Sequence, residues 1–105
     1  MDILRGGASV GRKLRFGMYH GMSCTWPLAS LSVSEETLIV DVVFKSYSFY
    51  RNEIEELVLH RGLLGSRLEI KHSKKDFPSL ISFRPFFTNP LIIILKKYRY
   101  AVISN

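Results

Sequence analysis

Apolar and polar residues alternate along the central part of the chain in short runs that turn residues separate. The run 38–44 places every second residue from Leu38 onward on one apolar face, and the run 67–72 does the same with Leu68 and Ile70. Because successive side chains of a strand point to opposite faces, this period of two predicts strands with one face buried. Weaker runs of the same kind lie at 28–33, 47–50, 55–61 and 80–84. Short strands at this spacing are typical of an antiparallel meander, so we expect a mainly β fold, a small β-barrel or sandwich of about six or seven strands.

The pattern changes near the C-terminus, where apolar residues recur at helical spacing. Asn89 is a residue type suited to a helix N-cap, and Pro90 suits the first helical position. The apolar face of this segment consists of Leu91, Ile94, Leu95, Tyr98 and Val102. We therefore expect one C-terminal α-helix, beginning near Pro90 and packed against the sheet. Isoleucine is β-branched, so a strand over 91–95 stays as the alternative.

The inward-facing positions of these elements predict the hydrophobic core. The residues expected to be buried are Leu31, Leu38, Val40, Val42, Leu57, Leu59, Leu68, Ile70, Ile81, Phe83, Leu91, Leu95 and Tyr98.

Residues 1–27 differ from the rest because they hold five of the seven glycines of the chain. Glycine at this density disfavours both helix and strand, so we predict a basic, irregular N-terminal arm that ends at Trp26–Pro27. The apolar side chains Phe16 and Tyr19 would anchor the arm on the domain of residues 28–105 or on a neighbouring copy. This favours a homo-oligomer.

The formal net charge is +6, and the basic excess lies at the two ends of the chain. Residues 1–27 carry four basic side chains and one acid, and residues 84–105 carry four basic side chains and no acid. We expect these ends to contact an anionic partner, such as an acidic protein face, an anionic membrane surface or nucleic acid. The candidate contact residues are Arg5, Arg12, Lys13, Arg15, Lys96, Lys97 and Arg99. If the arm runs back over the end of the helix, the two clusters form one patch; otherwise they are independent solvated charges.

Residues with catalytic or metal-binding chemistry are sparse. Cys24 is the single cysteine, so no disulfide within the chain is expected. His20 and Cys24 have a ligand-like spacing, but structural zinc sites usually need paired motifs, and we predict no metal. The segment 21–25 does not match the Gly-x-Ser-x-Gly pattern of a hydrolase nucleophile, and 62–66 lacks the lysine of a phosphate-binding loop. No catalytic residue and no cofactor are predicted, and a small hydrolase is the least favoured alternative.

Three segments carry a family resemblance. Residues 26–31 read Trp-Pro-Leu-Ala-Ser-Leu, residues 49–57 read Phe-Tyr-Arg-Asn-Glu-Ile-Glu-Glu-Leu, and residues 65–72 precede the strand-like 80–83. Together they resemble the pleckstrin-homology-like (PH-like) fold, in particular its small bacterial members of uncharacterised function. The resemblance implies a barrel whose C-terminal helix covers one opening or one face. Members of this fold that bind inositol phosphates carry basic residues around the first hairpin loop, whereas that loop here reads Ser-Glu-Glu-Thr and would repel phosphate.

These observations favour a non-catalytic binding or assembly module rather than an enzyme. Its partner would be another protein or a second copy, bound by the basic ends or by a strand edge left unpaired. Nucleic-acid binding is the alternative, because Tyr47, Tyr98 and Tyr100 accompany basic residues as in single-strand binders. No apolar run before residue 28 resembles a signal peptide, so we expect a cytoplasmic protein, with peripheral contact to an anionic membrane as a further option.

Overall fold

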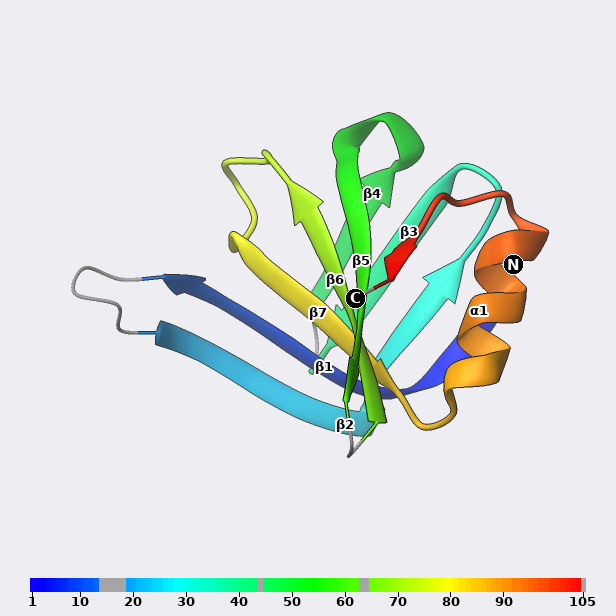
Figure 1. Cartoon of the computed structure of the whole chain (residues 1–105). Helices are drawn as coiled ribbons and strands as arrows, with labels where there is room; N and C mark the ends of the chain where they lie inside the picture. The colour runs from blue at the N-terminus through cyan, green and yellow to red at the C-terminus, as the bar shows by residue number, and fades with distance from the viewer. Residues whose placement is uncertain (14–18, 44, 63–64, 105) are drawn as a thin grey trace.

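The computed structural model describes residues 1–13, 19–43, 45–62 and 65–104, with the backbone alone for residues 12, 13 and 19–22. Its strands are β1 (Asp2–Lys13), β2 (Tyr19–Val33), β3 (Thr37–Val42), β4 (Lys45–Tyr50), β5 (Ile54–Gly62), β6 (Gly65–His72), β7 (Leu80–Pro85) and β8 (Ile103–Ser104) (Figure 1). A short 3-10 helix, η2 (Arg51–Glu53), joins β4 to β5, and one α-helix, α1 (Thr88–Lys97), follows β7. Within the described residues the fold is therefore mainly β with one helix near the C-terminus, as the sequence predicts.

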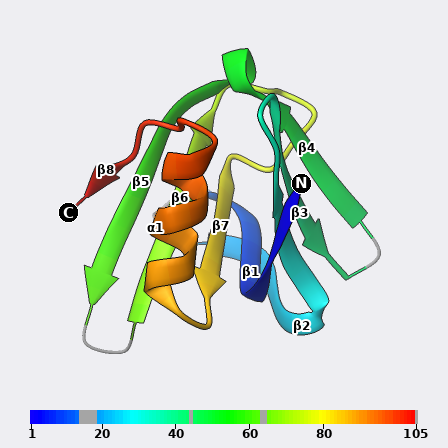
Figure 2. The same cartoon turned by 90° about the vertical axis from the view of Figure 1, so that its right-hand side faces the viewer.

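The strands form one sheet in the order β4-β3-β2-β1-β7-β6-β5-β8. The pairs are antiparallel except for β5 and β8, which are parallel. The long strands β1 and β2 serve both halves of this sheet. Residues 2–5 of β1 pair with the end of β2, which also pairs with β3, whereas residues 6–11 of β1 pair with β7. Between these halves the register of β1 and β2 shifts beside Gly6, and the sheet bends there (Figure 2).

The structure corrects the prediction of six or seven strands, because eight strands occur among the described residues. The sheet is also not closed, since β4 and β8 stand at opposite ends of the strand order. The prediction of an irregular arm over residues 1–27 is wrong. Residues 2–13 and 19–27 lie in β1 and β2, and β1 is the strand that joins the two halves.

Gly6 shows why a segment rich in glycine forms a strand here. A Cβ atom at this position would lie 2.0 Å from the backbone oxygen of Arg84 and 2.8 Å from Cζ of Phe83. The close approach of β1 to β7 at the bend therefore requires a residue without a side chain.

The core lies on the concave face of the sheet, where the buried apolar side chains of both halves form one cluster. Every residue predicted to be buried is buried except Tyr98, which is half-buried. The N-terminal segment adds Leu4, Ala8 and Val10 to this core, which the arm prediction did not include. The alternation within β1 thus places apolar side chains inward despite its glycines.

The helix α1 begins at Thr88, two residues before Pro90, and its N-cap is Phe87 rather than Asn89. The alternative of a strand over 91–95 is wrong. Leu91 and Leu95 are buried, with 0% and 2% of their surface exposed, so the helix packs one apolar face against the sheet. No helix of the described chain has the length and apolar character needed to cross a membrane.

Candidate binding edge of the sheet

Several strands leave one side without a full antiparallel neighbour, among them β4, β5, β8 and the first part of β2. A strand edge presents backbone N–H and C=O groups that can pair with another chain, and proteins usually block such edges. How each edge is treated therefore indicates which part of this sheet is free to bind.

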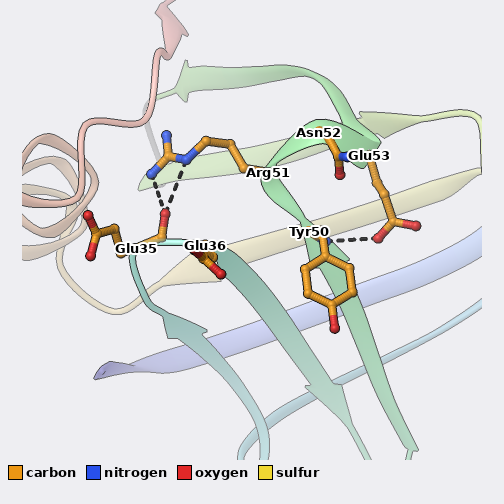
Figure 3. A pocket seen from close by; sticks show the side chains of 6 residues that line it. All are labelled: Glu35, Glu36, Tyr50, Arg51, Asn52 and Glu53. Carbon is orange, nitrogen blue, oxygen red and sulfur yellow. Dashed lines mark hydrogen bonds between the residues drawn. The ribbon is translucent and has the colours of Figure 1, made fainter.

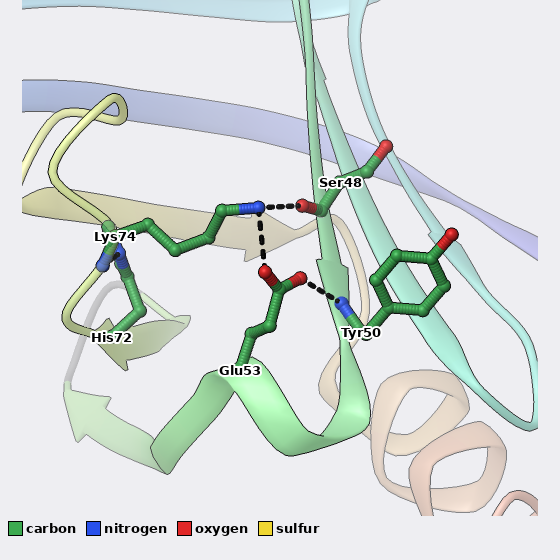
Figure 4. A network of polar contacts seen from close by, with 5 residues as sticks. All are labelled: Ser48, Tyr50, Glu53, His72 and Lys74. Carbon is green, nitrogen blue, oxygen red and sulfur yellow. Dashed lines mark hydrogen bonds and ion pairs between the residues drawn. The ribbon is translucent and has the colours of Figure 1, made fainter.

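The edge of β4 is blocked by a network of side chains (Figure 4). Lys74 donates from Nζ to the carbonyl oxygen of Ser48 at 3.3 Å, and the N–H of Tyr50 donates to Oε1 of Glu53 at 2.8 Å. Lys74 and Glu53 also form an ion pair of 3.1 Å. The hydrogen bond from Tyr50, together with Lys74, holds the pKa of the Glu53 carboxyl below its usual value. One outward backbone group at each of Ser48 and Tyr50 is thus already occupied.

Aromatic packing holds this network in place. The ring of Phe77 lies edge-on to Tyr47 and to Phe49, with a centroid separation of 5.3 Å in each pair. The ammonium group of Lys74 lies 4.2 Å from the centroid of Phe77. These contacts join the loop after β6 to β4.

The edge of β5 is covered in part by the C-terminal strand β8, whose own outer side has no strand neighbour in the described sheet. Val58 pairs with Ile103 and Leu59 with Ser104 in a parallel arrangement. The outward backbone groups of β5 are therefore engaged by β8 only around these two positions.

The first part of β2 is another open edge, and it is longer than the two-residue strand β8. Residues 19–25 pair with β1 and, within the described residues, with no second strand, because β3 pairs only with residues 29–33. In Figure 1 this hairpin of β1 and β2 projects away from the rest of the molecule, on the side opposite α1. Among the described residues, no second strand therefore lies along the outer side of residues 19–25.

The hydrogen-bond phase shows which residues of β2 point to this open side. The N–H of Phe86 donates to the carbonyl oxygen of Arg5 at 3.1 Å. This hydrogen bond joins the two residues that flank the pair Gly6–Pro85, so Gly6 and Pro85 are a pair that exchanges no backbone hydrogen bonds. The next residues of β1 alternate, so Gly7 directs its backbone groups to β7 and Ala8 directs its own to β2. Ala8 pairs with Cys24, so Cys24 is bonded to β1.

By the same alternation, Ser23 and Thr25 direct their N–H and C=O groups to the open edge. Both residues are exposed, and Cys24 between them is half-buried and donates its thiol hydrogen to the carbonyl oxygen of Leu28 at 3.4 Å. Residues 19–25 include no lysine, arginine, acid or proline. The features that usually prevent pairing at an edge are therefore missing from this one.

A second feature is an open depression of about 730 Å³ lined by Glu35, Glu36, Tyr50, Arg51, Asn52 and Glu53 (Figure 3). Its central residue serves the fold. Arg51 donates from Nε and Nη2 to the carbonyl oxygen of Glu35 at 3.1 and 2.6 Å, and from Nη1 to that of Arg99 at 2.9 Å. The guanidinium carbon also lies 3.9 Å from the centroid of the Tyr100 ring. Arg51 thus connects the loop after β2 to the end of α1. The other charged side chains that line the depression are the carboxylates Glu35, Glu36 and Glu53.

The structure places the candidate basic residues in separate regions. Arg5 lies on β1, and its guanidinium carbon is 5.1 Å from the centroid of the Trp26 ring. Arg12 and Lys13 lie at the far end of the same strand, and Arg15 lies outside the described residues. At a rise of about 3.3 Å per residue, the far end of β1 is roughly 35 Å from its start.

The C-terminal cluster meets the start of β1. Lys97 donates from Nζ to Oδ2 of Asp2 at 3.0 Å, and the hydroxyl of Tyr98 donates to the same oxygen at 2.8 Å. These bonds, first from Lys97 and then from Tyr98, lower the pKa of the Asp2 carboxyl. Lys96 and Arg99 are exposed beside them. Since the far end of β1 points away from α1 (Figure 1), Arg12 and Lys13 lie apart from the C-terminal cluster.

The tyrosines of the nucleic-acid alternative are engaged within the fold. Tyr100 is 8% exposed, and its hydroxyl donates to the carbonyl oxygen of Ser34 at 2.8 Å. Tyr47 is buried against Phe77. Among the described residues, no group of three or more His, Cys, Asp or Glu side chains is arranged to hold a metal ion.

Sequence reasoning named an unpaired strand edge as a binding surface but did not locate it in β2. The signal was present as the absence of charge and proline over 19–25, a segment that follows the basic stretch 12–15. Its meaning depends on knowing that these residues form a strand.

The sequence matches no model of a known protein family. It also matches none of the curated proteins with which it was compared.

Proposed function

We propose that this protein is a non-catalytic assembly module of PH-like architecture, which binds a second copy of itself through the open edge of β2. The antiparallel meander, with a single helix against the concave face of the curled sheet, supports the PH-like part of this proposal. The observation that carries the assembly is the outward direction of the backbone groups of Ser23 and Thr25 at an unguarded edge.

Pairing of two β2 edges about a twofold axis is the simplest association that satisfies the edges of both copies. The same surface then serves on each side, as in most homodimers. An antiparallel arrangement keeps Arg12 and Lys13 of one copy away from the same residues of the other, because they then lie at opposite ends of the joint. The side chains at Ser23 and Thr25 add no like charge to the contact.

Sedimentation equilibrium of wild type, Ser23→Pro and Ser23→Ala tests this function. Proline at residue 23 removes an N–H that points outward, so the hydrogen bonds to β1 remain while pairing across the edge is blocked. We expect a dimer for wild type and Ser23→Ala at micromolar concentration, and a monomer for Ser23→Pro. A monomer in all three samples up to millimolar concentration, or a dimer that Ser23→Pro leaves intact, would overturn the proposal. Circular dichroism shows separately whether the proline variant is folded.

A further inference from the structure

Two arginines stand side by side on the convex face of the sheet. Leu68 of β6 pairs with Phe83 of β7. Because the strands are antiparallel, Arg67, which precedes Leu68, lies opposite Arg84, which follows Phe83. Both side chains therefore point to the same face from opposed positions. Like charges directly opposite each other destabilise a sheet. Within the described part of the chain, neither arginine forms an ion pair or a hydrogen bond through its side chain.

Both arginines line a hollow of about 240 Å³ together with Ser9, Glu69 and Ser82. The small side chains of β1 and β7 leave this space on the face of the sheet. Ser82 is buried, with 7% of its surface exposed, and lies in the row beside the arginine pair. The hollow thus combines two guanidinium groups with hydroxyl groups.

The carboxylate in this hollow already has a partner. Oε1 of Glu69 lies 2.8 Å from Nε2 of His60, on the neighbouring strand β5. Glu69 is therefore held by His60 rather than by either arginine. The two arginines thus outnumber the single carboxylate of the hollow, and neither is paired with it.

A second hollow of about 740 Å³ adjoins the first, because Ser9 and Arg84 line both. Its wall includes Cys24, Thr25 and the ring of Phe86, which is 54% exposed. An exposed ring beside a cationic hollow provides an apolar surface for the organic part of an anion.

We propose that the paired hollows bind a small phosphate monoester. Arg67 and Arg84 would bind the phosphate oxygens, since two guanidinium forks match the charge and geometry of a dianion better than those of a single carboxylate. The hydroxyl of Ser82 adds a donor, and the ester group lies in the larger hollow against Phe86. The hollow that holds the phosphate includes no residue of β2, whereas the larger hollow shares Ser23 and Thr25 with the strand edge proposed for assembly.

Isothermal titration calorimetry with inorganic phosphate, methyl phosphate and phenyl phosphate tests the site. We expect phenyl phosphate to bind most tightly to wild type, and Arg67→Gln and Arg84→Gln each to weaken it by about tenfold or more. Phe86→Ser should lower the affinity for phenyl phosphate to that for methyl phosphate. Arg61→Gln changes an exposed arginine of β5 outside both hollows and should leave binding unchanged.

Thermal unfolding without ligand separates loss of binding from loss of fold. Removing one of two opposed like charges should keep or raise the melting temperature of Arg67→Gln and Arg84→Gln. The proposal fails if wild type binds none of the three probes. It also fails if Arg61→Gln weakens binding as much as the other two variants, because the net charge alone would then account for it.

Discussion

The substitution Gly6→Ala tests most simply whether the glycine-rich N-terminal segment is part of the folded sheet. The added Cβ would lie 2.0 Å from the backbone oxygen of Arg84, a distance that the rotation of a side chain cannot relieve. Either β1 or β7 must move, which breaks the pairing of Gly6 with Pro85 at the bend. Overpacking of a well-packed site typically costs 1–3 kcal/mol, and since this contact involves backbone we expect a loss of at least about 3 kcal/mol.

Such a loss is a large part of the roughly 5–15 kcal/mol that stabilises a domain of this size. Urea denaturation followed by the fluorescence of Trp26, the single tryptophan, measures it directly. Gly62→Ala is the matched control, because a Cβ there would meet its nearest neighbour at an ordinary 3.5 Å. That control should change the free energy of unfolding by less than about 1 kcal/mol. A change of similar size for Gly6→Ala would mean that residues 1–13 lie loosely on the domain, as an arm would, and would refute this description of β1.

Three further predictions concern the core, the acid limb of stability and the Arg51 clamp. Ile70→Ala and Leu95→Ala should each lower the free energy of unfolding, measured by urea denaturation, by about 2–5 kcal/mol, because both side chains are buried. A loss below about 1 kcal/mol at both positions would mean that these side chains do not face the core. The pKa of Asp2 is lowered in the folded state, so its contribution is present above the ordinary value of 3.8 and is lost as pH falls through the folded pKa. Asp2→Asn should therefore flatten the acid limb of a plot of unfolding free energy against pH, and an unchanged slope would show that the contact with Lys97 is not kept in solution. Arg51→Lys should cost about 1–3 kcal/mol, because a single ammonium cannot reach the carbonyl oxygens of Glu35 and Arg99 together, whereas Arg61→Lys should cost little.

The part of the fold that could be predicted from sequence is the part whose signal is local. In β3 and β6 the alternation of Leu38, Val40, Leu68 and Ile70 with polar residues fixes both the strand and its buried face. The helix was predicted from its own spacing, with an error of two residues at its start.

The missed elements depend on contacts between distant residues. Gly6 favours irregular structure by its intrinsic conformational freedom, and only the approach of Arg84, far along the chain, makes it the residue a strand needs. The strand β8 spans two residues, too few for a periodic pattern, and exists because Val58 and Leu59 offer an edge.

The candidate edge was missed for the same reason. Whether residues 19–25 are free on one side depends on where the pairing of β3 with β2 ends. The residue types within 19–25 do not determine that end point. The basic residues at the two ends of the chain were found from composition, but their separation along β1 is a property of the folded sheet.

Hydrogen exchange of individual backbone amides, measured by NMR at low and high protein concentration, tests the assembly most directly. We expect the N–H groups of Ser23 and Thr25 to exchange rapidly in the dilute monomer and to become protected as concentration rises. The N–H of Cys24, which bonds to β1, should be protected at both concentrations. Exchange of Ser23 and Thr25 that stays rapid at all concentrations, or protection that rises equally at Cys24, would contradict pairing through the edge of β2.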